Sequence, residues 1–144
     1  MSQAAVFKRV TRAWGLSRVG SRIEAHLSAL MPSQVIRTTD NGVTFYWPAH
    51  ANPSTWDSVR VPGSDPETRR SIDEIGLEEL GNAAVYILMQ QGGMSQHGLV
   101  KAVCRLLGVA RTTADAGARI ARALAYGRVQ TMVVVEEGSV RLRK

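Results

Sequence analysis

The chain has 144 residues, of which 44% are hydrophobic, so it can bury a core and is too apolar to be disordered throughout. Its single cysteine, Cys104, excludes an internal disulfide and a zinc site built from several cysteines. No apolar run reaches the roughly 18 residues that span a bilayer, and residues 1–15 lack the long apolar stretch of a signal peptide. We therefore expect a cytoplasmic protein with no membrane segment and no cofactor.

The net charge of +6 is unevenly distributed along the chain. Residues 1–50 carry six Lys/Arg and two Asp/Glu, residues 51–100 carry three and seven, and residues 101–144 carry nine and three. Basic segments of this kind indicate a polyanionic partner, most often nucleic acid. The alternative is ordinary surface charge that keeps the protein in solution.

Two helices and a hairpin are expected in residues 1–48. They are a helix over residues 3–13, a helix over residues 19–31 that follows a Gly15–Arg18 turn, and a hairpin over residues 34–47. Helical spacing places Ile23, Leu27 and Leu30 inward. Asn41-Gly42 is a strong hairpin signal because both residues tolerate the positive φ of a type I′ turn.

Residues 49–75 are expected to form an irregular connector packed on the units that flank it. The stretch 48–76 contains four of the five prolines, which interrupt regular elements. Trp56 and Val61 are the expected anchors of this connector, because a segment this apolar is not expected to remain in solvent.

Three helices and a second hairpin are expected in residues 76–144. The helices cover residues 77–91, 96–107 and about 112–126, with Ser95 as an N-cap and Gly108 as the glycine that ends the second helix. Two strands follow, residues 128–135 and residues 139–143, and in the latter Val140 and Leu142 alternate with Arg141 and Arg143.

One phrase occurs twice, 93 positions apart. The stretches "VFKRVTRAWGLSR" (Val6–Arg18) and "LVKAVCRLLGVAR" (Leu99–Arg111) share five residues in register, and each is followed by a helix and a hairpin. A helix, a short turn, a second helix and a hairpin form the core of a winged helix. The repetition predicts an α+β, mostly helical fold of tandem winged-helix units.

The two units are not equivalent. Residues 76–144 predict a complete winged-helix unit, whereas residues 1–48 predict an incomplete unit without a counterpart of the helix over 77–91. A three-helix core without one helix leaves apolar surface uncovered, which the second unit, a second chain or an upstream segment must cover. We therefore expect a homodimer, or a chain that is the tail of a larger protein.

The helix after each turn carries the candidate nucleic-acid contacts, because in a DNA-binding winged helix this helix enters the major groove. In the second unit Thr112, Asp115, Arg119, Arg122 and Tyr126 have the spacing of one helix face, opposite Ile120 and Leu124. Candidate contacts are Arg111, Thr112, Arg119, Arg122, Tyr126, Arg141 and Arg143 in the second unit, and Arg18, Ser21, Arg22 and Arg37 in the first. Two alternatives stay open: a solvated helix face, and a repeated structural salt bridge made by Arg22 and Arg119.

Other chemistries find little support in the residue pattern. The three histidines have no metal-ligand spacing, and the acidic cluster of Asp73, Glu74, Glu78 and Glu79 fits the start of a helix. No combination of nucleophile, base and orienting group is visible. The remaining candidates fit core positions: Cys104, Trp14 and Trp47.

The chain resembles an uncharacterised family. The resemblance rests on the runs "WGLSRVGSRI", "FYWP", "SIDEIGLEELGNAAVYIL", "LVKAVCRLLG" and "ARI", and covers about Val6 to Val135. This family is a domain of unknown function at the C-terminus of very large bacterial proteins with a superfamily-1 helicase core and a restriction-endonuclease-like domain. The resemblance implies an accessory of a DNA-processing or defence helicase and carries over no catalytic or ligand residue. Its pattern usually begins with a helix upstream of the first phrase, which this sequence lacks.

Two functions remain as hypotheses. The first is a non-enzymatic module that binds nucleic acid, most simply DNA, and contributes affinity rather than sequence recognition. The alternative is a protein–protein interaction module, in which the uncovered first unit is the docking site. The first expects Arg22, Arg119 and Arg122 to be exposed on one basic surface, and the second expects an apolar patch near Val10 and Trp14.

Overall fold

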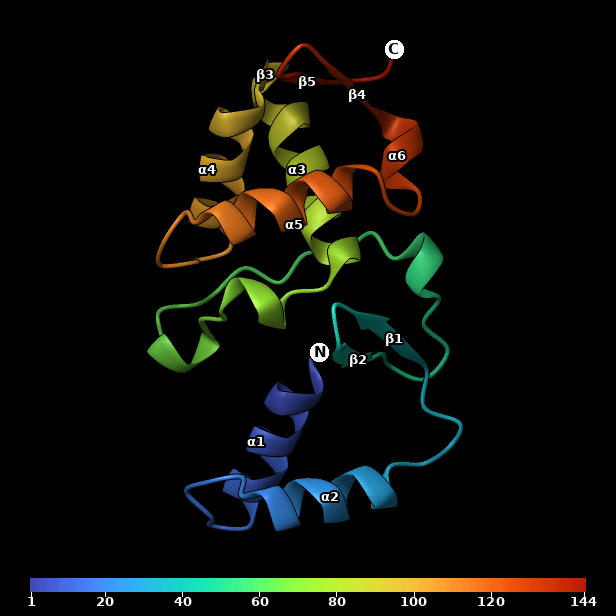
Figure 1. Cartoon of the computed structure of the whole chain (residues 1–144), viewed down its shortest axis with the longest axis vertical. Coiled ribbons are helices and arrows are strands. Elements are labelled where there is room, and N and C mark those ends of the chain that lie inside the picture. The colour runs from blue at the N-terminus through green and yellow to red at the C-terminus, as the bar shows by residue number, and fades with distance from the viewer. The chain divides into compact units, whose positions relative to one another are not determined.

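The computed structural model describes all 144 residues, Met1–Lys144, and divides into two compact units, Met1–Asn52 and Pro53–Lys144. The fold is α+β, with six α-helices and two small antiparallel sheets (Figure 1). None of the helices has both the length and the apolar character needed to cross a bilayer.

The first unit contains two helices and a hairpin, close to the expected positions. They are α1 (Gln3–Ala13), α2 (Ser21–Leu30), β1 (Arg37–Asp40) and β2 (Val43–Tyr46). Asn41 and Gly42 both have positive φ, 49° and 79°, so the hairpin turn has the predicted backbone conformation. A small core forms around Phe7, whose ring centroid lies 6.4 Å from that of Tyr46.

The second unit is built around α3 (Leu77–Gln91), which is buried along most of its length. This helix packs against α4 (Gln96–Leu106), α5 (Ala114–Leu124) and the short α6 (Val129–Met132). The strands β3 (Met94–Ser95), β4 (Val133–Glu136) and β5 (Ser139–Leu142) form one antiparallel sheet in the order β3-β5-β4. Three short 3-10 helices, η1 (Pro53–Thr55), η2 (Pro66–Thr68) and η3 (Ile72–Glu74), precede α3.

The expectation of a strand over residues 128–135 was wrong in its first half, where α6 forms instead. The cause is packing against α3, since Val129 is buried and a Cβ on Gly81 of α3 would lie 2.8 Å from Cγ2 of Val129. The packing of the Val129 side chain against α3 therefore outweighs the preference of β-branched residues for strands.

Strand β3 was missed, and with it the true start of the repeat. Met1-Ser2-Gln3 repeats as Met94-Ser95-Gln96, in the same register as the longer phrase. The Ser2 and Ser95 side chains each accept a hydrogen bond from the third backbone N–H of their helix, and both residues pair with the second strand of a hairpin. Two residues are too few for strand periodicity to reveal.

The segment from Pro53 to Ile75 belongs to the second unit. The Asn82 side chain on α3 donates hydrogen bonds to the carbonyl oxygens of Trp56 (2.9 Å) and Ser58 (3.3 Å). Val61, expected to be an anchor, is 57% exposed, whereas the neighbouring Val59 packs against the core of the second unit.

Gly108 follows the end of α4 where predicted, and it also allows the connector to pack closely against this turn. Its φ is +66°, and a Cβ at this position would lie 2.6 Å from Cγ of Pro62. A glycine is needed here for two reasons, the left-handed backbone conformation and the close approach of the proline ring.

Gly108→Ala is expected to destabilise the second unit more than Gly127→Ala. Gly127 also has positive φ, +54°, but a Cβ there would meet no atom within 4 Å. The left-handed conformation costs either variant about 1–2 kcal/mol, and overpacking against Pro62 adds about 1–3 kcal/mol at position 108. Urea unfolding, followed through the amide signals of α3, measures the free energy of unfolding of both variants. An equal loss of stability in the two variants would contradict the packing role of Gly108.

Candidate interaction surfaces

Arg119 is not on the exposed face where the helical spacing placed it. It is 2% exposed, and its Nη2 donates a hydrogen bond of 2.7 Å to the carbonyl oxygen of Ile75. The chain segment between η3 and α3 covers this edge of α5, which no pattern within α5 could reveal. Arg119 is therefore a structural residue of the second unit through a hydrogen bond with a backbone carbonyl, whereas the alternative hypothesis gave it a repeated salt bridge.

The other predicted contacts on and next to α5 are exposed. They are Arg111, Thr112, Arg122 and Tyr126. The opposite face, including Ile120 and Leu124, is buried as expected. Thr112 also contacts the buried Cys104. Burial raises the pKa of the Cys104 thiol, and a hydrogen bond with the Thr112 side chain lowers it in part.

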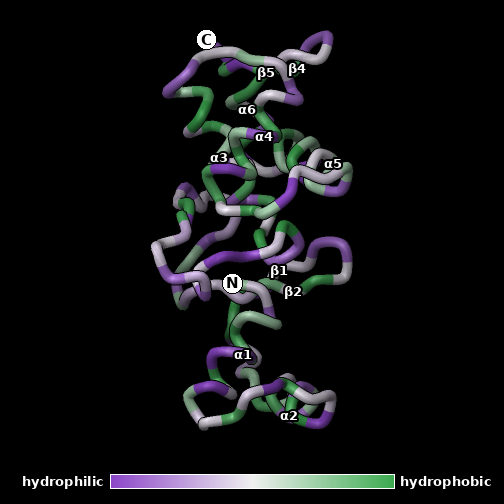
Figure 2. The backbone as a smooth tube through the Cα atoms, turned by 90° about the vertical axis from the view of Figure 1, so that its left-hand side faces the viewer, coloured by the Kyte–Doolittle hydropathy of each residue, from purple (hydrophilic) through white to green (hydrophobic).

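The second hairpin does not lie beside the start of α5. The backbone N–H of Gln96 donates to the carbonyl oxygen of Gly138 (2.7 Å), so the hairpin turn lies at the first residue of α4, whereas Arg111 and Thr112 follow its last turn. A helix of 11 residues separates these ends by about 16 Å. Figures 1 and 2 show the hairpin and α5 at opposite ends of α4.

The two hairpin arginines are also engaged within the protein. Arg141 forms an exposed ion pair with Glu136 (3.4 Å), and the Nε of Arg143 donates to the carbonyl oxygen of Thr131 (3.1 Å). The second unit therefore does not gather the predicted basic residues into one continuous surface.

The predicted contacts of the first unit, Arg18, Ser21, Arg22 and Arg37, are all exposed. Arg37 lies with its guanidinium 5.6 Å from the centroid of the Tyr46 ring and donates to the carbonyl oxygen of Pro32 (3.1 Å). Arg37 therefore helps to hold the hairpin, while Arg22 lies on α2.

Glu79, from the predicted acidic cluster, is buried between two arginines of the connector. Arg70 binds both carboxylate oxygens at 2.8 and 2.9 Å, and Arg60 binds them through its side chain and its backbone N–H, the latter at 2.8 Å. Burial would raise the pKa of Glu79, but the hydrogen bonds and charges of Arg70 and Arg60 lower it to about 2. The carboxylate is saturated by these donors, and the structure contains no group of three or more side chains that could hold a metal ion.

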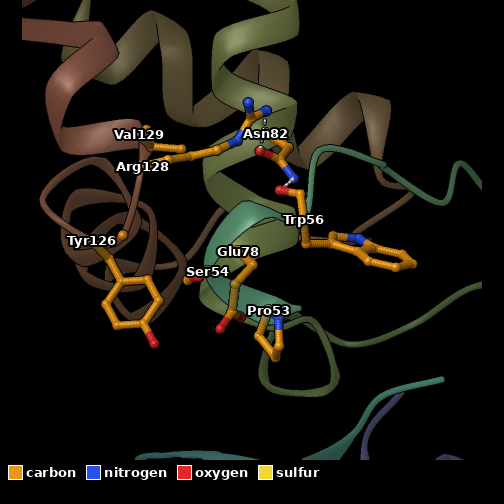
Figure 3. A pocket seen from close by; sticks show the side chains of 9 residues that line it. Pro53, Ser54, Trp56, Glu78, Asn82, Tyr126, Arg128 and Val129 are labelled. Atoms are coloured by element: carbon orange, nitrogen blue, oxygen red, sulfur yellow. Dashed lines mark hydrogen bonds between the residues drawn. The ribbon is translucent and has the colours of Figure 1, made fainter. Parts of the chain in front are cut away.

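Among the hollows of the second unit, one is the size of a water molecule and another is a wider groove. The first is lined by Asn82, Tyr126 and Arg128 and has a volume of about 10 Å³, enough for one water molecule. Figure 3 shows Asn82 between the Trp56 carbonyl and Arg128, whose Nη2 donates to the Asn82 amide oxygen (3.2 Å). The second is a groove of about 420 Å³ lined by Val85, Met89, Thr131, Met132, Leu142, Arg143 and Lys144.

The first unit exposes a face that the second unit buries. Val6, Val10 and Trp14 of α1 are equivalent to Leu99, Val103 and Leu107 in the repeated phrase. The three residues of the second unit are 0% exposed, whereas Val6 and Val10 are half-buried and Trp14 is 60% exposed. The prediction that Trp14 occupies a core position was therefore wrong.

The same difference appears on α2. The motif Gly-Ser-Arg-Ile at residues 20–23 repeats as Gly-Ala-Arg-Ile at residues 117–120. Arg22 and His26 are exposed, although their equivalents Arg119 and Ala123 are buried. Leu30, predicted to face inward, is 58% exposed.

The exposed side of the first unit corresponds to the surface that α3 covers in the second unit. In the second unit α3 packs on both α4 and α5, and a Cβ on its Gly81 would lie 3.2 Å from the carbonyl oxygen of Ala123. The first unit contains no such helix, so one side of its core is open. We call this surface the open face and define it by six residues: Val6, Val10, Trp14, Arg22, His26 and Leu30.

Comparisons of the chain with models of protein families, with curated proteins and with solved structures found no match in any of the three.

The Glu79 cluster makes the stability of the second unit depend on acidity. The unfolded chain takes up a proton at this carboxyl near pH 4.5, and the folded protein does so only near pH 2, so stability is lost as the pH falls through this window. The difference corresponds to about 3 kcal/mol. Glu79→Gln is expected to be less stable at pH 7 by about that amount and to lose less stability on acidification.

Urea unfolding of both proteins at pH 7, 4.5 and 2.5, followed through the amide signals of α3, tests this expectation. Glu67→Gln, an exposed carboxylate on η2, is the matched control. An unchanged pH dependence in Glu79→Gln would show that the cluster does not stabilise the fold.

Proposed function

We propose that the chain is a non-enzymatic, cytoplasmic interaction module made of two winged-helix units, the first of which accepts a helix from a partner. The observation that supports this proposal most directly is the exposure of Trp14, 60%, against 0% for its equivalent Leu107. Large apolar side chains grouped on one surface are typical of protein interaction sites.

The winged-helix assignment is supported by the order of elements in the second unit. Three helices, the short α6 and a hairpin follow one another, and a short strand between the first two helices joins the sheet as β3. The short α6 has no counterpart in the first unit. The first unit repeats this order from its N-terminal strand-like residues onward, without the first helix. A helix bound from outside would complete its three-helix core.

The binding of a helix equivalent to α3 tests this function. The probe is a fluorescein-labelled peptide of residues 77–91 in which Tyr86 and Met89, exposed on α3, are replaced by Gln to keep it soluble. The full chain is expected to bind it, and Trp14→Glu is expected to weaken binding at least about tenfold, since a buried aromatic anchor is lost. Fluorescence anisotropy measures the dissociation constants.

Tyr86→Glu in the full chain is the matched control, since it places the same charge at an exposed aromatic residue outside the open face. Circular dichroism checks that both variants stay folded. No binding, or equal binding by the wild type and Trp14→Glu, would contradict the proposed function.

A second candidate function is nucleic-acid binding, most simply of DNA, in an accessory of a DNA-processing or defence helicase. Arg111 and Arg122 flank an exposed stretch of α5 in which Ala114 and Ala118 leave room for a close approach. Cationic side chains at both ends of such a helix can contact phosphates. The burial of Arg119 reduces the charge available at this surface.

This second candidate predicts salt-dependent binding of labelled duplex DNA. Arg111→Ala/Arg122→Ala is expected to lower the affinity and the salt dependence, because each lost phosphate contact reduces counterion release. Arg141→Ala, whose side chain is paired with Glu136 at the far end of α4, is the control. Fluorescence anisotropy at two salt concentrations measures the dissociation constants. No binding of DNA at low salt would exclude this function.

A further inference from the structure

We propose that the open face binds an amphipathic helix with an acidic first turn, supplied by a partner protein, and that Arg22 binds the backbone carbonyl just before it. This inference rests on the proposed interaction function and names the chemistry of the partner. Its evidence is the different environment of two equivalent arginines in the repeat.

Arg119 shows what this position does when a helix is present. Its Nη2 donates to the carbonyl oxygen of Ile75, which lies directly before Gly76, the N-cap of α3. Arg22 occupies the same position of the repeated motif, one residue before Ile23, and its side chain is exposed. A helix placed on the open face as α3 lies on α4 and α5 would bring the equivalent carbonyl to Arg22.

The apolar part of the open face sets the nature of the partner helix. Val6 and Val10 of α1 and its C-cap residue Trp14 are spaced four residues apart, so they form a stripe about 12 Å long. Leu30 contributes a further exposed apolar side chain on α2. A helix with apolar residues over two to three turns covers this surface, as α3 covers its equivalent.

Charge favours an acidic partner over a second copy of this chain. The first unit has six Lys/Arg and two Asp/Glu, and the open face itself contains Arg22 and His26. Two copies packed through this face would bring like charges together, which opposes association. The α3 helix of a second copy is also not available, because it is buried in its own unit.

The helix that covers the second unit already has the expected acidic start. Glu78 and Glu79 lie in the first turn of α3, and Asp73 and Glu74 lie in η3 before it. Carboxylates at a helix N-terminus also interact favourably with the helix dipole. Residues 71–91 therefore provide a probe with the chemistry that the open face is expected to recognise.

The experiment compares two peptides on the full chain by fluorescence anisotropy. One covers residues 71–91 and contains the carbonyl of Ile75, the other covers residues 77–91, and both have Tyr86 and Met89 replaced by Gln. Arg22→Ala is expected to weaken binding of the longer peptide about tenfold, because one charge-assisted hydrogen bond is lost. Binding of the shorter peptide, which lacks the Ile75 carbonyl, is expected to weaken less. Arg18→Ala, an exposed arginine outside the open face, is the matched control.

Charge is tested with the longer peptide carrying Asp73→Lys, Glu74→Lys, Glu78→Lys and Glu79→Lys. This peptide is expected to bind at least about tenfold more weakly than the acidic one. Binding of both peptides that depends on Trp14 but not on Arg22 or on charge would overturn this inference and leave the proposed function standing. Absence of any binding would overturn both.

Two further measurements on the free chain complete the test. Sedimentation is expected to show a monomer, and a dimer abolished by Trp14→Glu would make a second copy the occupant and overturn the inference. The indole N–H signal of Trp14, assigned with Trp14→Phe, is expected to shift only when peptide is added. Protection of this indole from solvent in a monomeric chain without peptide would show that the face is already covered.

Discussion

The carboxylate of Glu79, buried between the guanidinium groups of Arg60 and Arg70, is the interaction on which the second unit depends most. It joins an irregular segment, which contributes few apolar side chains to the core, to the central helix α3. A buried charge without partners would be costly, so the connector and the helix must form together. Asn82, one turn further along α3, adds hydrogen bonds to the backbone of the same segment.

This attachment decides which arginines of α5 can meet a partner. With the connector held on α3, the carbonyl of Ile75 reaches Arg119 and removes it from the surface. Arg122, one turn later, is exposed. The nucleic-acid hypothesis therefore loses one of its central residues to a contact within the second unit.

The repeat allows one unit to serve as a reference for the other. Several buried residues of α4 and α5 have exposed or half-buried equivalents in the first unit, along the side that corresponds to the place of α3. Val10 and Val103 are identical, so at this position the difference in exposure reflects the missing helix, whereas Trp14 and His26 also differ in residue type from their equivalents Leu107 and Ala123. This side of the first unit is therefore the surface at which we propose that a helix binds.

Apolar periodicity, N-cap serines and turn glycines act within a few residues, so the sequence predicted the five longer helices, both hairpins and the internal repeat. It also indicated that the first unit lacks a covering helix. The tertiary structure alone decided that α6 replaces half of a strand, that Arg119 is buried, and that Trp14 and Leu30 are exposed. These outcomes depend on which segment lies over each helix face, and that is set by contacts between residues far apart in the chain, such as Ile75 with Arg119 and Glu79 with Arg60.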